Sequence, residues 1–413
     1  MRARWLLASL ILGAVLLAGT VSRGHTPIAS RYTYNEHLFP IFRDRCGACH
    51  VNGGIAPMSL VTYKEAFPWA QSIREEVLAL RMPPWRAEDG FGDFRNGHAL
   101  AAREMDMILE WSSGGYPPGP RALEPKPVDL SPRWDLGDPS LRLEMPAEFQ
   151  IPPETSEVVR FFVLPSQTNA DRWIKAVDFM PGARPVVRDV VVYIDATGGA
   201  KQLDAADAAP GFAPPADGSF PTSQPIAVWV PSQKPVVLDD TAAYKLPRGA
   251  AVVLRIHYKK TWITDGQPFA DRSTVGLYFA EANSKAVETM IISSPSTLSG
   301  RQAAFTHTID RDVTALALLP EVGMEMGEMQ VEAVRPDGTR EPMLLLREPT
   351  GAWPTRYWFD RPIALPKGTQ LEVAASLKPG ADRVSAASLL AGAPGAPVRL
   401  LMDFVSGGRA AAN

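Results

Sequence analysis

The sequence Cys46-Gly47-Ala48-Cys49-His50 places two thiols three residues apart, with an imidazole next to the second thiol. These are the only 2 cysteines among 413 residues. Each thiol at this spacing can form a thioether with one vinyl group of a haem, while the adjacent imidazole reaches the iron from the same turn. The motif predicts one covalently attached haem c, bound by Cys46 and Cys49, with His50 as the proximal iron ligand.

Other uses of paired cysteines need residues that this sequence does not supply. A structural zinc site takes four ligands at a characteristic spacing. A thioredoxin-like redox pair belongs to a βαβ unit, and no strand pattern precedes Cys46. The remaining histidines are scattered along the chain, at His25, His37, His98, His257 and His307.

The sixth iron ligand would be a side chain held rigidly beside the haem. Met82 is the first choice, because Pro83 and Pro84 follow it directly and stiffen its backbone. A thioether at this position would stabilise ferrous iron. Met58 is the alternative, and His37 and His98 are further ones. Iron without a sixth ligand would be open to reaction with peroxide. The alternative role of any of these methionines is to fill the apolar core.

Three helical patterns would position the motif. Asn35 can cap a first helix that leads to Cys46, and Thr62 to Glu65 form a capping box for a second. A third carries Met105 and Ile108 on one face and ends at Gly114-Gly115. Residues 25 to 119 are therefore predicted to form an all-α cytochrome c domain.

The N-terminus predicts export. Two arginines precede an apolar run from Trp5 to Ala18, which is shorter than the roughly 20 residues of a membrane span and suits a signal peptide over residues 1 to 24. This predicts a periplasmic protein, with an uncleaved leader as the alternative. No later apolar stretch has spanning length. With 42 basic and 45 acidic residues, the chain has no charge excess that favours nucleic acid.

The rest of the chain has β patterns. Prolines between Pro117 and Pro132 predict a stiff linker over residues 120 to 142. Short apolar or alternating runs follow, and the turn Leu246-Pro247-Arg248-Gly249 is repeated as Leu365-Pro366-Lys367-Gly368, each leading into a strand pattern. The predicted fold is multidomain: an all-α cytochrome c domain followed by an all-β tandem of two β-sandwiches, over residues 143 to 282 and 283 to 408.

Several stretches carry a family resemblance. Ala56-Pro57-Met58-Ser59-Leu60, Pro68-Trp69-Ala70 and Arg81-Met82-Pro83-Pro84-Trp85 resemble the cytochrome domain that bacteria attach to copper type II, ascorbate-dependent monooxygenase modules. Residues 172 to 177, 186 to 194, 246 to 258, 329 to 338 and 365 to 373 resemble the two-sandwich core of peptidylglycine α-hydroxylating monooxygenase and its bacterial relatives. The resemblance implies a covalent haem followed by two sandwiches that each bind one copper.

Most copper ligands that the resemblance implies are absent. Arg188-Asp189 stands where the family has a His-His pair, and Glu321-Val322-Gly323 replaces its His-x-His. His257 matches the third ligand of the first site, but Lys259 replaces the second histidine of bacterial members, and no methionine-bearing segment follows Lys378 before the last strand. One of six copper positions survives, so the chain is predicted to bind no catalytic copper, with His257 as a residual copper position.

Two groups of residues are candidate substitutes for the lost sites. Met324, Met326 and Met329 cluster near His307 and offer thioethers for Cu(I), although packing is the usual fate of such methionines. Arg188 and Asp189 would form a salt-bridged plug beside His257.

Together these features predict an exported mono-haem c-type cytochrome that transfers one electron, with a copper-free sandwich module that docks a redox partner protein. The alternatives are a copper monooxygenase fed by its own haem, and a haem peroxidase.

Overall fold

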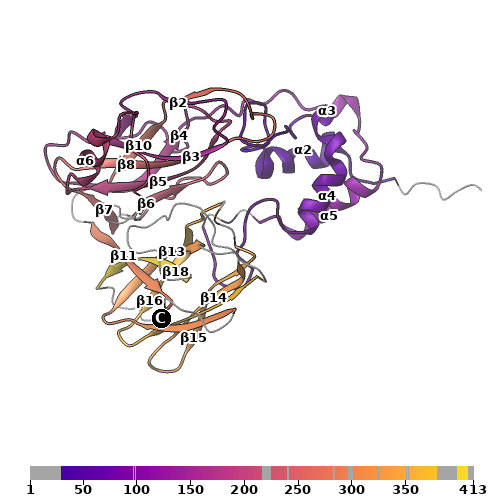
Figure 1. Cartoon of the computed structure of the whole chain (residues 1–413). Coiled ribbons are helices and arrows are strands. Elements are labelled where there is room, and N and C mark those ends of the chain that lie inside the picture. Colours follow the sequence, from indigo (N-terminus) through magenta and orange to yellow (C-terminus); the bar gives the residue numbers. More distant parts are fainter. Residues whose placement is uncertain are drawn as a thin grey trace, which may run out of the picture.

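The computed structural model describes residues 29–95, 97, 99–215, 225–239, 241–281, 284–295, 301–322, 326–349, 351, 353–378 and 398–407. The predicted leader and the residues His25, His98 and Met324 lie outside these ranges. The described part of the chain is predominantly β (Figure 1). Within it, no helix has both the length and the apolar composition that a membrane crossing requires.

The fold class predicted from the sequence is wrong, because the N-terminal segment (residues 29–123) is not a substantial all-α domain. Its longest helix, α5 (Ala102–Ser113), has 12 residues and α4 (Ala70–Leu78) has 9. Pro40 and Pro68 lie in short turns where the helix type changes, because proline has no backbone N–H to donate to the helical hydrogen-bond ladder. The short pieces are η1 (Tyr34–Leu38), α2 (Phe39–Ile41), η2 (Phe42–Cys46), α3 (Tyr63–Ala66), η3 (Phe67–Trp69) and η4 (Arg121–Leu123).

The first β module (residues 141–281) packs two sheets against each other around an apolar core. One sheet has the order β3-β8-β5-β6, and the strands of the other have the order β1-β10-β4-β7. Helix α6 (Gly199–Ala206) and the pair β2 (Phe149–Ile151) and β9 (Phe269–Asp271) complete the module. The strands are β3 (Glu157–Pro165), β8 (Ala251–Lys259), β5 (Val187–Asp195), β6 (Pro225–Trp229), β1 (Leu141–Glu144), β10 (Thr274–Phe279), β4 (Arg172–Met180) and β7 (Ala242–Leu246).

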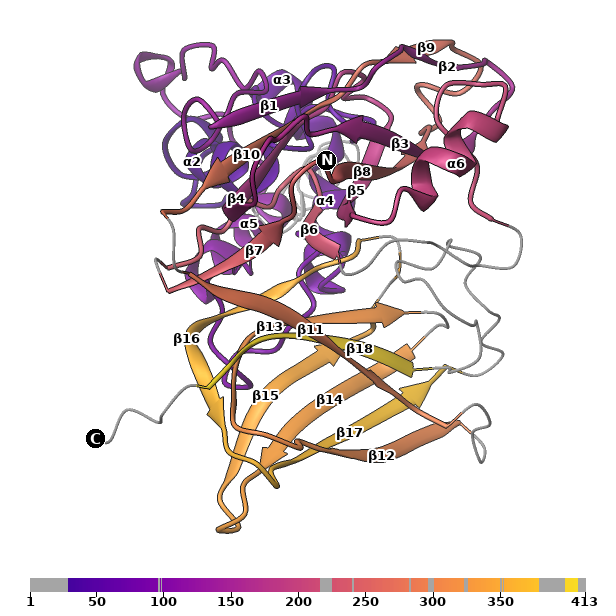
Figure 2. The ribbon, with the colours of Figure 1, turned by 90° about the vertical axis from the view of Figure 1, so that its left-hand side faces the viewer.

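The second β module (residues 284–406) has the same two-layer plan (Figure 2). Its sheets have the orders β11-β18-β13-β16 and β12-β17-β14-β15, and they enclose a second core. The strands are β11 (Lys285–Ser293), β18 (Val398–Ser406), β13 (Val313–Val322), β16 (Tyr357–Leu365), β12 (Gln302–Thr308), β17 (Gln370–Leu377), β14 (Met326–Val334) and β15 (Arg340–Arg347).

The two modules share one sheet. Strand β7 pairs in parallel with β11, so that β1-β10-β4-β7-β11-β18-β13-β16 is a continuous 8-stranded sheet. Across this junction, the buried Arg356 guanidinium contacts Asp403 at 3.3 Å and donates to the Tyr244 hydroxyl at 3.0 Å. The repeated Leu-Pro-x-Gly turns have equivalent places, because each leads from the 8-stranded sheet into a 4-stranded one. Gly249 and Gly368 take φ values of 71° and 89° there, which favour glycine.

The N-terminal segment contacts both modules. Its residues 86–95 run along the second module, where Ala87 bridges to Leu346 of β15 and Phe94 bridges to Phe359 of β16. Strands β15 and β16 are edge strands, so this stretch covers one open side of the second module. The linker lies against the first module, where the carbonyl of Gly137 accepts a hydrogen bond from the Tyr278 hydroxyl at 2.6 Å. The N-terminal segment and the linker are therefore packed against elements far apart in sequence.

Candidate functional site

The motif residues Cys46, Cys49 and His50 come from one tight turn at the end of η2. The amides of Cys49 and His50 both donate to the carbonyl of Cys46, at 3.1 and 2.8 Å. Both cysteines are free thiols. The structure therefore brings together the three residues that the sequence predicts for haem attachment, in a short loop that offers two sulfurs and an imidazole.

The ring of His50 is oriented by a backbone carbonyl. Its Nδ1 lies 3.1 Å from the carbonyl oxygen of Met58. A carbonyl only accepts hydrogen bonds, so Nδ1 carries the proton and Nε2 keeps its lone pair. Burial lowers the pKa of His50, and the hydrogen bond to Met58 opposes this only in part. The imidazole is therefore neutral at pH 7, as an iron ligand must be.

The loop that supplies this carbonyl is itself anchored. The Leu60 amide donates to the carbonyl of His50 at 3.0 Å, and the Tyr34 hydroxyl donates to the carbonyl of Leu60 at 2.8 Å. Glu65 accepts hydrogen bonds from Asn52, Ser59 and Thr62, at 2.8, 2.7 and 2.7 Å. The predicted capping box is confirmed, because the Thr62 side chain also accepts from the Glu65 amide. These contacts hold the loop in place beside His50.

Both cysteines are half-buried. Burial raises the pKa of Cys46 to about 12 and that of Cys49 to about 11. A redox-active cysteine pair instead has a thiol whose pKa is lowered, because the thiolate is the nucleophile. The raised pKa values of both thiols disfavour a thioredoxin-like pair.

The candidate distal ligands differ in their placement. Because the Met58 carbonyl contacts Nδ1, the Met58 main chain lies at the ring edge remote from Nε2, where a distal ligand does not belong. Met82 is half-buried after α4, and its amide lies 3.3 Å from the Glu76 carbonyl. The ring of His37 is used locally, since its Nδ1 accepts from the Thr33 amide at 3.2 Å. The distal role of Met82 stays a prediction.

The motif loop faces the first β module. The Cys49 sulfur lies 4.0 Å from the carbonyl oxygen of Pro231, which follows β6. Arg184, just before β5, donates to the carbonyl of Ala48 at 3.0 Å and to that of Leu130 in the linker at 2.8 Å. Sequence reasoning missed Arg184, because nothing in its local pattern shows which distant loop it contacts.

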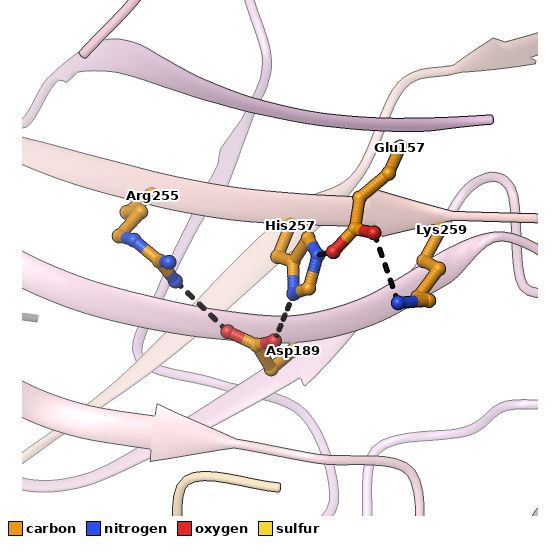
Figure 3. A network of polar contacts seen from close by, with 5 residues as sticks. All are labelled: Glu157, Asp189, Arg255, His257 and Lys259. Carbon is orange, nitrogen blue, oxygen red and sulfur yellow. Dashed lines mark hydrogen bonds and ion pairs between the residues drawn. The ribbon is translucent and has the colours of Figure 1, made fainter. Parts of the chain in front are cut away.

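A second polar site lies on strands β3, β5 and β8 (Figure 3). The Nδ1 of His257 is 2.6 Å from Asp189, and its Nε2 is 2.7 Å from Glu157. Arg255 donates to the other oxygen of Asp189 at 2.9 Å, and Lys259 donates to Glu157 at 2.9 Å. His257 is thus held between two carboxylates, each of which has a cationic partner of its own.

The predicted plug of Arg188 and Asp189 is wrong in one partner. Asp189 contacts His257 as expected, but Arg255 supplies the guanidinium instead of Arg188. Arg188 is the extra residue at an irregularity in the pairing of β5 with β8, between Val187 and Asp189, and no ion pair joins it to Asp189 within the described residues. The sequence held a signal for the correct set, since Arg255, His257 and Lys259 alternate along β8 and share one face.

The residues considered as copper ligands lie in both β modules. Both ring nitrogens of His257 contact carboxylates, so a copper ion there would have to displace one of them. In the second module, Met326 and Met329 are buried in the apolar core, and half-buried His307 lies on β12. Among the residues that the structure describes, no group of three or more His, Cys, Asp or Glu side chains could hold a metal ion. The sequence-based classification as a metal-binding cytochrome c is therefore corrected: the chain is mainly β and contains no such described cluster.

Comparisons with known proteins identify no relative. No family model and no curated protein matches the chain. Among solved structures, the major capsid protein P2 of bacteriophage PM2 is similar with a TM-score of 0.27 and 10% identity, over 66% of this chain and 100% of that chain. The VP2 subviral particle of infectious bursal disease virus is similar with a TM-score of 0.17 and 8% identity, over 65% of this chain and 72% of that chain.

Proposed function

We propose that this chain carries one haem, attached covalently through Cys46 and Cys49 with His50 as the proximal iron ligand, and that it transfers single electrons. The hydrogen bond from His50 Nδ1 to the Met58 carbonyl carries this proposal. It sets the tautomer that leaves Nε2 for iron, and Nε2 makes no hydrogen bond within the described residues. Two thiols on the same turn supply the attachment points.

The protein's own residues bind and orient the cofactor. Cys46 and Cys49 would fix its edge, the Met58 carbonyl holds the ring of His50 in one orientation, and Met82 is proposed as the distal ligand. When bound, the haem supplies an iron that accepts and returns one electron. The first β module stands next to Cys49, so one side of the attachment site is built from outside the N-terminal segment.

We further propose that the β modules dock a redox partner protein and that the chain works in the periplasm, as the leader pattern implies. The resemblance to copper type II monooxygenase modules, together with the missing copper ligands, supports β modules that serve as a docking surface and not as a copper site. The contacts of both His257 nitrogens with carboxylates disfavour copper binding at this residue.

Haem and metal analysis of the full chain, produced together with a haem-attachment system, tests the proposal. We expect one iron per chain, a haem that stays with denatured protein, and loss of this haem in the Cys46→Ser, Cys49→Ser double variant. Denatured protein that releases its haem, or that never carried one, would refute the proposal. Stoichiometric copper would support the monooxygenase instead. A ferric spectrum of five-coordinate iron, unchanged by Met82→Ala, would support the peroxidase.

A further inference from the structure

A strap of residues 85–95 connects the N-terminal segment with the second β module (Figure 2). Its first half pairs with edge strand β15, where the Glu88 amide donates to the Leu345 carbonyl at 2.9 Å. Its second half pairs with edge strand β16, where the Arg95 amide donates to the Trp358 carbonyl at 2.9 Å. The strap is therefore built into the second module, although its sequence belongs to the N-terminal segment.

Two aromatic rings of the strap anchor it in the second module. The ring centre of Trp85 lies 5.1 Å from that of buried Tyr357, and the ring centre of Phe94 lies 5.4 Å from the same tyrosine. Phe94 also stacks on buried Phe359 at 5.8 Å. Ring pairs at these separations attract each other beyond the effect of burial alone. Trp85 is therefore held by the core of the second module, against which it packs.

The proposed distal ligand Met82 lies three residues before Trp85. Three residues span at most about 10 Å, so Met82 cannot move far from an anchored Trp85. The two residues between them are Pro83 and Pro84, whose rings fix φ and remove much of the remaining backbone freedom. The anchor of Trp85 therefore restricts where the Met82 thioether can lie.

A hydrogen bond at the base of this loop adds a second restraint. The Arg86 guanidinium donates to the Leu80 carbonyl at 2.9 Å and so closes the loop of residues 81–85. The Arg86 carbonyl in turn accepts from the Arg347 amide of β15 at 3.0 Å. The loop that carries Met82 is therefore tied both to the chain just after α4 and to β15.

We infer that Trp85 and Arg86 are positioning residues, through which the second β module holds the distal ligand Met82 in place at the haem iron. This inference rests on the proposed function, because Met82 is a ligand only where a haem is attached. A ligand that is held in its bound position before it binds loses little freedom on binding. An added small ligand therefore competes poorly with Met82 while the strap is anchored, and competes better once the strap is released.

Imidazole titration of the ferric, haem-loaded full chain tests the inference. Trp85→Ala removes the ring that packs on Tyr357, and it should raise the affinity for imidazole about tenfold, which corresponds to about 1.4 kcal/mol. The absorption band that arises from charge transfer between methionine and ferric iron should weaken in the same variant. Trp85→Phe keeps a ring against Tyr357 and should stay close to wild type.

Arg86→Met tests the second restraint independently. It removes the hydrogen bond to the Leu80 carbonyl but keeps the aromatic anchor, so it should also raise the affinity for imidazole. Phe67→Ala is the matched control, because it removes an aromatic ring of the N-terminal segment that stacks on Tyr63 at 5.2 Å. This control should leave both the imidazole affinity and the charge-transfer band unchanged.

The possible results separate this inference from the proposed function. If wild-type protein carries no covalent haem, the proposed function fails and the inference fails with it. If haem is attached but Trp85→Ala and Arg86→Met both bind imidazole as wild type does, only the positioning role fails. A charge-transfer band that persists in Met82→Ala would overturn the inference, because Met82 would then not be the ligand. An equal gain in Phe67→Ala would also overturn it, because any loss of packing in the N-terminal segment would then have the same effect.

Discussion

The imidazole of His50 donates from Nδ1 to the backbone carbonyl of Met58, eight positions later in the chain, at 3.1 Å. This contact ties the orientation of the proposed iron ligand to the conformation of residues 51–60. Hydrogen bonds from Tyr34, in η1, and to Glu65, in α3, hold this loop in place. The site is therefore sensitive to residues that touch neither the thiols nor the imidazole.

Tyr34→Phe should destabilise the N-terminal segment and lower the yield of attached haem. The substitution removes the donor to the Leu60 carbonyl and leaves this buried oxygen without its partner, which costs about 1–3 kcal/mol. Urea denaturation measures the change in the free energy of unfolding. Tyr63→Phe is the matched control, because its hydroxyl donates at 3.2 Å in an exposed contact with the Tyr116 carbonyl. Equal losses in the two variants would contradict this account.

The loop beside His50 should weaken in acid because of Glu65. Burial by itself would raise the pKa of Glu65, but hydrogen bonds from Thr62, Ser59 and Asn52 outweigh burial and lower this pKa from its usual 4.5. A carboxyl with a lowered folded-state pKa stabilises the fold above the unfolded pKa, and this contribution is lost as pH falls through the folded pKa. Wild type should therefore lose more stability than Glu65→Gln between about pH 5 and pH 3. Parallel pH profiles, measured by thermal unfolding, would show that Glu65 plays no such part.

Asp189→Asn should strongly destabilise the first β module. Arg255 and Asp189 are both 2% exposed, and removal of one partner of a buried ion pair costs about 3–5 kcal/mol. Lys259→Met is the control, because the pair of Lys259 with Glu157 is roughly half exposed and exposed pairs are worth at most about 1 kcal/mol. Denaturant titration of both variants gives the comparison. A loss for Asp189→Asn no larger than that for Lys259→Met would mean that the network is not structural.

Arg184→Met should loosen the motif loop without unfolding the module. The substitution removes two donors, to Ala48 and Leu130, and a hydrogen bond from a charged group contributes about 1.5–3 kcal/mol. Local opening should therefore become at least about tenfold more frequent, seen as faster hydrogen exchange at the amides of Cys49 and His50. Arg142→Met is the control, because it removes an exposed arginine, and it should leave the hydrogen exchange of these amides unchanged. Unaltered exchange in Arg184→Met would show that the loop is held by other contacts.

The sequence predicted local features well and their packing poorly. The capping box at Thr62 and the end of the third helix at Gly114 are present, because both depend on residues a few positions apart. The prediction of a substantial all-α domain was wrong, because the N-terminal helices are short pieces of mixed type and the described chain is mainly β. The joined sheet was not predicted either. Its parallel contact between β7 and β11 involves only two residue pairs, which leave no periodic signal.

The sequence by itself determined which residues can do chemistry: two thiols and an imidazole on five consecutive positions, whose spacing is fixed by the covalent chain. Only the tertiary structure decided that Arg255 pairs with Asp189, that Glu157 contacts His257, and that Arg184 donates to the carbonyl of Ala48. These contacts join residues from 66 to more than 100 positions apart, and such pairs are chosen by the packing of sheets and loops, which no local pattern encodes.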